Sequence, residues 1–234
     1  MAGVGGVYRR RIDLLTTSPS AVTGELEDSF HHFRVSIAHD AGRVTAVDGE
    51  AVRHPWSTCP DALGPLRALV GAPITPDATA HGAHADARTT CTHWFDLAGL
   101  AMAQAADGRE RRRYDVVVGE RDDRGRATAD LSRDGEPVLA WEVDATTVLG
   151  PDPYTGQTMG RGFLAWANDR FDPETAEAAI VLRRACRISL GLLMDLDQYE
   201  TAADVGHGMD DTCHTFSRSV SPVALRMKGS TRVD

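Results

Sequence analysis

The alternation of apolar and polar residues in the first quarter of the chain predicts an antiparallel sheet. Phe33, Val35 and Ile37 alternate with polar residues, which is typical of a strand with one buried face. Asp and Gly at positions 40–43 suit a hairpin turn, so the chain is expected to reverse there. The strands predicted in this part of the chain are residues 8–15, 25–40 and 44–53.

Apolar residues at helical spacing then predict helices. Pro60 suits the first turn of a helix because its missing N–H is not needed there, and Leu63, Leu66 and Leu69 continue the stripe. Pro65 lies inside that stripe and argues against one unbroken helix. The first predicted helix runs from about residues 58–60 to residue 71, and the second from about residues 90–92 to residue 107. The third runs from about residue 173 to residue 195.

The second half of the chain has shorter periodic segments. Short strands are predicted over residues 113–120, 127–132 and 137–143, followed by a Pro/Gly-rich linker over 150–162. We therefore expect an α+β fold in which helices pack on an antiparallel hairpin, with an added β-meander and a long C-terminal helix. Residues 1–110 would form a metal-binding half and residues 111–234 the meander, long helix and irregular tail, packed together as one globular unit.

Composition limits the classes of partner. The 234 residues are 42% hydrophobic, enough for a substantial core, and the net charge is −9. An acidic chain lacks the basic face that nucleic acid or an anionic membrane surface requires. No apolar run approaches the roughly 20 residues of a membrane helix, and no signal peptide is recognised, so the cytoplasm is the expected compartment.

The cysteines are the first candidates for chemistry, because four of them in a cytoplasmic chain do not indicate a disulfide framework. Cys59 and Cys91 each stand where a helix is predicted to start, and such a position lowers a thiol pKa and favours thiolate. Thiolate binds metals and attacks electrophiles. The alternative is that both are small buried apolar residues. Cys186 is interpreted as packing. Cys213 with its neighbour His214 is interpreted as an ordinary loop, with the alternative that it lends a ligand or folds over the site.

Acids and histidines cluster in the first part of the second predicted strand, residues 25–40. Glu27 and Asp28 precede His31, and His93 follows Cys91 closely. Thiolate, imidazole and carboxylate together suit zinc or iron. The spacing lacks the short C-x-x-C of a zinc finger, and the acids and histidines could equally be solvated side chains. The predicted metal ligands are Cys59, Cys91, Glu27 and His31, and the predicted catalytic residues are His31, His93 and Asp28.

Three phrases resemble an uncharacterised bacterial family known only as a domain of unknown function. They begin at Glu25 (ELED, then HHF), at Pro55 (PWSTCP) and at Cys91 (CTHWFDL). That resemblance carries no assigned activity.

The first roughly 110 residues are also similar to the U-type iron–sulfur cluster scaffold proteins. Cys59 and Cys91 match two of the cysteines of those proteins. Glu27 or Asp28 stands where their earliest cysteine would fall, and Thr90 replaces the histidine before their last one. Three thiolates suit a cluster, whereas two thiolates with imidazole and carboxylate suit a single ion. The resemblance therefore implies a metal site of this layout and disfavours cluster assembly.

These patterns lead us to expect a metal-dependent enzyme that acts on a small organic molecule as a hydrolase, hydratase or lyase. One alternative is a non-enzymatic carrier of a metal or an iron–sulfur cluster. Another is a metal-free enzyme in which Cys59 or Cys91 is the nucleophile and His93 the base. The expected cofactor is a zinc or iron ion. The expected partner is a small-molecule substrate, and the sheet and long helix leave room for a homodimer.

Overall fold

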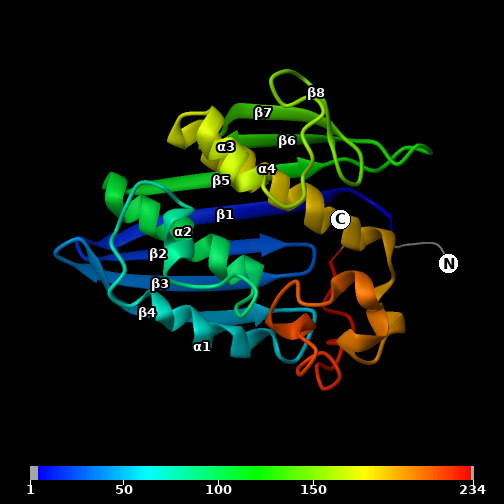
Figure 1. The fold of residues 1–234 in the computed structure, drawn as a ribbon, viewed down its shortest axis with the longest axis horizontal. Helices are drawn as coiled ribbons and strands as arrows, with labels where there is room; N and C mark the ends of the chain where they lie inside the picture. Colours follow the sequence, from blue (N-terminus) through cyan, green and yellow to red (C-terminus); the bar gives the residue numbers. More distant parts are fainter. Residues whose placement is uncertain (1–4, 233–234) are drawn as a thin grey trace. The chain divides into compact units, whose positions relative to one another are not determined.

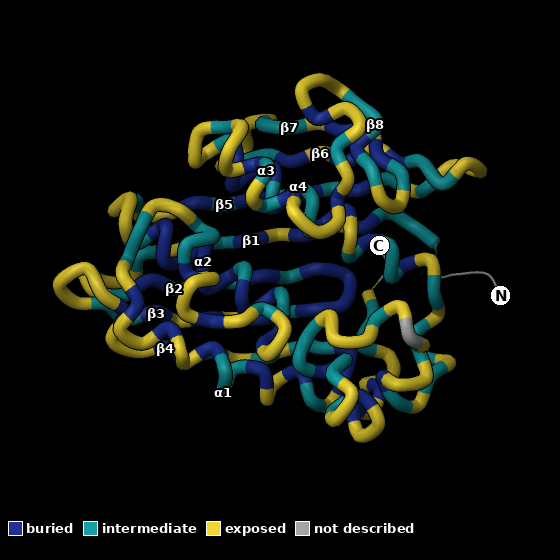
Figure 2. The backbone as a smooth tube through the Cα atoms, in the orientation of Figure 1, coloured by how far each residue is buried: buried dark blue, intermediate teal, exposed yellow. Residues whose placement is uncertain are grey.

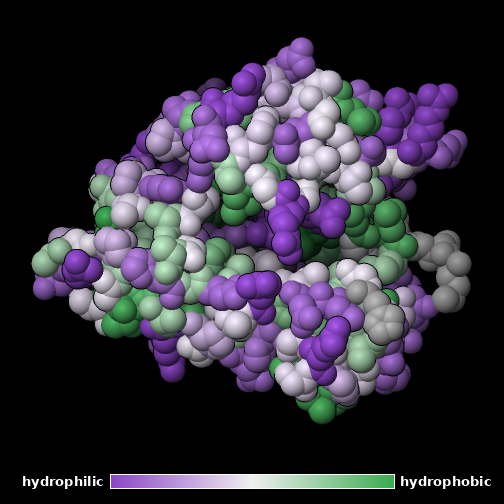
Figure 3. Space-filling view, in the orientation of Figure 1, coloured by the Kyte–Doolittle hydropathy of each residue, from purple (hydrophilic) through white to green (hydrophobic). Residues whose placement is uncertain are grey.

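The computed structural model of the protein describes residues 5–232, which divide into two compact units. The first, here called the hairpin unit, comprises residues 12–112 and 196–232. The second, the meander unit, comprises residues 5–11 and 113–195. One division between the units falls at residue 112, and the tail after residue 195 belongs with residues 12–112. Hydrophilic residues are spread over much of the face drawn in Figure 3.

The hairpin unit contains an antiparallel sheet whose strands neighbour one another in the order β4-β3-β2-β1 (Figure 1). The strands are β1 (Tyr8–Ser18, of which residues 12–18 belong here), β2 (Ala21–Asp28), β3 (His32–Asp40) and β4 (Arg43–Arg53). Val22, Leu26, Phe33, Val35 and Ile37 are buried on one face of β2 and β3. The predicted hairpin between β3 and β4 is confirmed, with its turn at Ala41 and Gly42.

The predicted long strand over residues 25–40 is wrong, because the chain reverses between Asp28 and His32. The Asp28 Oδ1 atom accepts hydrogen bonds from the backbone N–H groups of Phe30 and His31, both at 2.8 Å. An aspartate that accepts backbone N–H groups two and three residues ahead stabilises a tight turn. The turn places Glu27 of β2 opposite His32 of β3. It also brings Asp28 and His31 to one end of the sheet.

The hairpin unit also contains helical segments, and those that pack against its strands lie between residues 59 and 107. In chain order, the helical segments of this unit are η1 (Cys59–Ala62), α1 (Leu63–Leu66), η2 (Arg67–Leu69), η3 (Ala80–Ala83), α2 (Thr92–Asp107), η5 (Leu196–Gln198), η6 (Ala202–Val205), η7 (His207–Met209) and η8 (His214–Phe216). The predicted break near Pro65 is confirmed, since the first helical region is a succession of short pieces. The predicted helix from about residue 91 to 107 is also confirmed, and Gly108 ends it in the left-handed conformation.

Helix α2 lies against β2 and β3, and both surfaces are buried (Figure 2). The Trp94 ring stacks on the Phe33 ring with centroids 4.8 Å apart. Gly49 of β4 leaves room for that indole, because a Cβ there would stand 2.3 Å from the Trp94 ring. Gly24 of β2 similarly admits Leu97. These close contacts fix the first turn of α2, and therefore His93, relative to the sheet.

The meander unit holds strands neighbouring one another in the order β5-β6-β7-β8, with helix α4 packed against β6 and β7 and helix α3 against α4. Its elements are β5 (Arg111–Val118), β6 (Ala127–Arg133), β7 (Glu136–Val143), β8 (Val148–Gly150), α3 (Phe163–Arg170), α4 (Pro173–Ser189) and η4 (Leu190–Leu193). The predicted meander and long helix are confirmed, as is the α+β class. Helix α3 was not predicted; it begins after Gly162, whose φ of 88° only glycine adopts readily.

Within residues 5–232, we find no helix that is both long enough and apolar enough to cross a membrane.

Candidate metal centre

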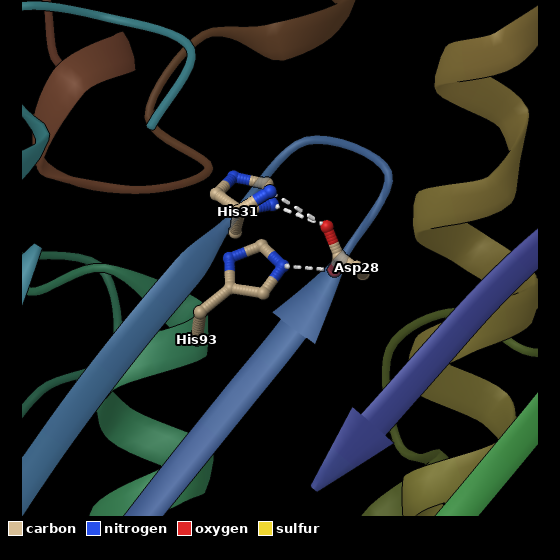
Figure 4. Close-up of side chains that lie close together, drawn as sticks. All are labelled: Asp28, His31 and His93. Atoms are coloured by element: carbon tan, nitrogen blue, oxygen red, sulfur yellow. Dashed lines mark hydrogen bonds and ion pairs between the residues drawn. The ribbon is translucent and has the colours of Figure 1, made fainter. Parts of the chain in front are cut away.

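Asp28, His31 and His93 form a compact group of potential ligands (Figure 4). One ligand atom from each lies within 4.8 Å of the others. His31 Nδ1 is 3.0 Å from Asp28 Oδ1, and His93 Nε2 is 3.7 Å from Asp28 Oδ2. The two imidazole rings stack with centroids 3.7 Å apart. Both histidines therefore direct a nitrogen at a different oxygen of the same carboxylate.

Local structure positions each member of this group. Asp28 ends β2, His31 stands in the turn that Asp28 stabilises, and His93 lies in the first turn of α2. The residues are 4%, 8% and 4% exposed respectively. A buried carboxylate is costly unless it is paired and hydrogen-bonded. Two backbone N–H groups and two imidazoles face this carboxylate, which accounts for its burial and holds its orientation.

The spacing of these atoms suits a small divalent ion. Bonds of about 2.0–2.1 Å from zinc to nitrogen or oxygen place tetrahedral ligands roughly 3.4 Å apart. The two observed separations, 3.0 and 3.7 Å, lie on either side of that value. Two imidazoles and one carboxylate are also the ligand set of many catalytic zinc and non-haem iron sites. Small side-chain adjustments would therefore allow these residues to hold zinc or iron.

The structure does not place Glu27, a predicted ligand, with this group. Alternation along β2 puts Glu27 on the opposite face from Asp28, where its side chain is 43% exposed. Its Oε1 atom accepts from Arg53 at 3.3 Å and from Arg232 at 3.0 Å. The carboxylate that the structure places in this group is therefore that of Asp28, and not that of Glu27.

Of the two predicted thiol ligands, Cys91 contacts a member of this group and Cys59 contacts the tail. Cys91 precedes α2, and its sulfur is 3.6 Å from Nδ1 of His93. Cys59 begins η1, and its sulfur is 3.7 Å from Oγ1 of Thr215. The predicted helix-start positions are therefore confirmed. Within residues 5–232, however, the group whose ligand atoms all lie within 4.8 Å of one another includes neither cysteine.

The expected lowering of the thiol pKa values is reversed in the structure. Burial raises the pKa of Cys59 to about 12, although Thr215 acts in the opposite direction. Burial also raises the pKa of Cys91 well above its ordinary value, and the nearby thiols of Cys213 and Cys59 add to the effect. Desolvation disfavours the charged thiolate more strongly than a helix start stabilises it. Without a bound cation, both thiols are neutral at physiological pH.

These buried thiols predict loss of stability at alkaline pH. Folded Cys59 keeps its proton up to a pKa of about 12, whereas an unfolded thiol loses it near 9. Between these values the unfolded state binds fewer protons, so the unfolding free energy falls as pH rises, by about 1.4 kcal/mol per pH unit per thiol. Below pH 9 the contribution is fully present. Urea unfolding at pH 8 and pH 10.5 measures the decline.

The matched variant for this prediction is Cys59→Ala. Between the two pH values, the unfolding free energy of this variant should fall less than that of the unmodified protein. The difference is the contribution of the Cys59 thiol. Equal declines in the two proteins would show that Cys59 does not titrate as its burial implies.

The tail contributes to this region, as one of the two interpretations of Cys213 and His214 allowed. Residues 196–232 return to the hairpin unit, where the backbone N–H of His214 donates to the carbonyl of Thr90 at 2.9 Å. This bond brings Cys213 and Thr215 to the region of Cys91 and Cys59. The adjacent Cys213 and His214 were the signal present in the sequence, but the intervening chain gave no indication of what they would contact.

Comparison with known proteins gives a match to one family, and that family has no assigned activity. Residues 15–106 match the model of a family described as "Protein of unknown function (DUF2889)". That range contains Asp28, His31 and His93 together with Cys59 and Cys91. No curated protein matches the chain. The likeness to U-type iron–sulfur scaffold proteins is not confirmed. Over residues 15–106, the match supports the resemblance to an uncharacterised family that the three sequence phrases indicated.

Proposed function

We propose that the protein is a metal-dependent enzyme acting on a small organic molecule, and that Asp28, His31 and His93 hold a zinc or iron(II) ion. The observation that carries the proposal is the convergence of two imidazole nitrogens and one carboxylate in a buried group. These atoms belong to three separately positioned residues, at a strand end, a turn and a helix start.

A set of three protein ligands favours catalysis over a purely structural role. Structural zinc sites are closed by four protein ligands, whereas catalytic sites keep a position for water or substrate. When bound, the ion would polarise a water or a substrate oxygen there, which serves hydrolysis, hydration or elimination. Asp28 balances part of the ion's charge, and the sulfur of Cys91 faces the second ring nitrogen of His93. Such a partner orients the imidazole toward the ion.

Metal content tests this proposal directly. Protein expressed with zinc or iron supplied, then dialysed, is expected to retain at least one ion per chain by elemental analysis. Asp28→Asn and His93→Ala should each reduce that content by about one ion per chain. Glu27→Gln is the matched control, because it alters the neighbouring carboxylate that lies outside the group. Absence of metal in the unmodified protein, or full retention in Asp28→Asn, would contradict the proposal.

One geometric feature favours a second candidate, a metal-free cysteine enzyme. His93 links Cys91 to Asp28. Its Nδ1 lies 3.6 Å from the sulfur of Cys91, and its Nε2 lies 3.7 Å from Oδ2 of Asp28. This is the order of nucleophile, base and orienting acid in covalent catalysis. Burial, however, raises the pKa of Cys91 and opposes thiolate formation. Rapid alkylation of Cys91 by iodoacetamide at neutral pH, unchanged by chelators, would favour this candidate over the metal enzyme.

A further inference from the structure

The three cysteines of the hairpin unit converge although they are distant in sequence. Cys59 begins η1, Cys91 precedes α2, and Cys213 precedes η8 in the returning tail. The segment η8 packs against η1. Each cysteine thus comes from a different helical start, and each is a free thiol. The chain's other cysteine, Cys186, lies in the meander unit.

Two sets of contacts bring the tail to the other two thiols. On one side, Thr215 Oγ1 lies 3.7 Å from the sulfur of Cys59 and 3.1 Å from Oγ1 of Thr58. On the other side, the bond between the His214 N–H and the Thr90 carbonyl joins the peptide after Cys213 to the peptide before Cys91. The Trp56 and Phe216 rings meet edge to face, with centroids 5.9 Å apart. Cys213 is therefore held between the segments that carry Cys59 and Cys91.

Three thiols gathered in one region suit a thiophilic cation, which binds them as thiolates and displaces their protons.

From this convergence we infer that Cys59, Cys91 and Cys213 form a second metal site, distinct from Asp28, His31 and His93, which takes a thiophilic cation such as zinc. The inference does not rest on the proposed function, because the ligand atoms of the two sites differ. Soft thiolate ligands select zinc or copper(I) over harder ions. The two sites are adjacent through His93, whose Nε2 faces Asp28 and whose Nδ1 faces the sulfur of Cys91.

Binding requires the sulfurs to close around the ion. Zinc–sulfur bonds of about 2.3 Å place tetrahedral sulfurs roughly 3.8 Å apart. Among the described residues, the ligand atoms of Asp28, His31 and His93 all lie within 4.8 Å of one another, and the three sulfurs do not meet that limit. The sulfurs would therefore have to draw closer together than they lie in the structure. A bound cation would add to the contacts that already hold residues 213–216 against the hairpin unit.

Cadmium titration of the reduced full-length protein, prepared without oxygen, tests the inference. Cadmium is a soft probe for a zinc–thiolate site, and its thiolates absorb in the ultraviolet by charge transfer. We expect the absorbance to saturate at one cadmium per chain, with release of about three protons at neutral pH, because three neutral thiols deprotonate. Cys59→Ser, Cys91→Ser and Cys213→Ser should each weaken binding by about tenfold or more.

Matched variants separate this site from the other one. Cys186→Ser should leave the cadmium band unchanged, since Cys186 lies in the meander unit. Asp28→Asn should also leave the band intact, even though it is expected to remove metal from the Asp28 group. Loss of the band in Asp28→Asn with retention in Cys213→Ser would overturn the inference while leaving the proposed function standing.

A measurement on the unmodified protein guards against variants that fail to fold. The cadmium NMR shift reports how many sulfurs ligate the ion, and we expect a value typical of three thiolates. A shift typical of nitrogen and oxygen ligands, or no charge-transfer band at any cadmium concentration, would overturn the inference.

Discussion

Replacement of Trp94 with alanine is expected to lower the free energy of unfolding by about 3–5 kcal/mol. Trp94 is completely buried, and its ring lies between Phe33 of β3 and the backbone of Gly49 in β4. Removal of the indole leaves a cavity that the sheet cannot fill, because backbone forms part of its wall. Urea unfolding followed by circular dichroism measures the loss.

A second tryptophan provides the control. Trp166 of α3 is partly exposed at the edge of the aromatic cluster in the meander unit. Trp166→Ala should cost less than Trp94→Ala because less of its surface is buried. A loss below about 1 kcal/mol for Trp94→Ala would mean that α2 does not depend on this contact. Since Trp94 adjoins His93, reduced metal content is also expected in this variant.

Replacement of Asp28 is expected to separate the structural role of this residue from its ligand role. Asp28→Ala removes the acceptor for the backbone N–H groups of Phe30 and His31, which are buried. Buried donors left without partners cost about 1–3 kcal/mol each, so we expect a loss of about 2–4 kcal/mol. Asp28→Asn keeps the Oδ1 acceptor, and its loss should be smaller.

Metal content then distinguishes the two roles. Both Asp28 variants should lose the ion, because an amide is a poor ligand beside a carboxylate. If Asp28→Asn is as unstable as Asp28→Ala, the negative charge of the Asp28 carboxylate stabilises this part of the sheet, and its hydrogen bonds to the turn do not. If Asp28→Asn retains metal, the carboxylate is a turn residue only. Denaturant unfolding and elemental analysis of the same preparations give both answers.

The elements with strong local signals were predictable from the sequence. The β3–β4 hairpin has alternating apolar residues and a turn containing Gly42, and α2 has an apolar stripe ended by Gly108. Both patterns act over a few residues, so neighbouring residues suffice to specify them. The helix-start positions of Cys59 and Cys91 were predictable for the same reason.

Other features depend on a turn that competes with a strand pattern, or on contacts between residues distant in sequence. Residues 25–40 have the composition of one strand, and the turn at Asp28 prevails through two hydrogen bonds that alternation does not reveal. That error moved the expected ligand from Asp28 to Glu27, because adjacent strand residues point to opposite faces. The thiol pKa values depend on burial in the folded unit and on Thr215 and Cys213 of the tail, and no local pattern predicts where the tail returns.

The return of residues 196–232 to the hairpin unit has a consequence for synthesis of the protein. Cys59 and Cys91 leave the ribosome long before Cys213 and Thr215 exist. Throughout that interval the segment that covers them is missing, so the two thiols stay accessible to oxidants and to metals of the cell. Because domains fold as the chain emerges, the meander unit completes before the hairpin unit can close. The nascent chain is therefore the form of this protein most sensitive to oxidative damage.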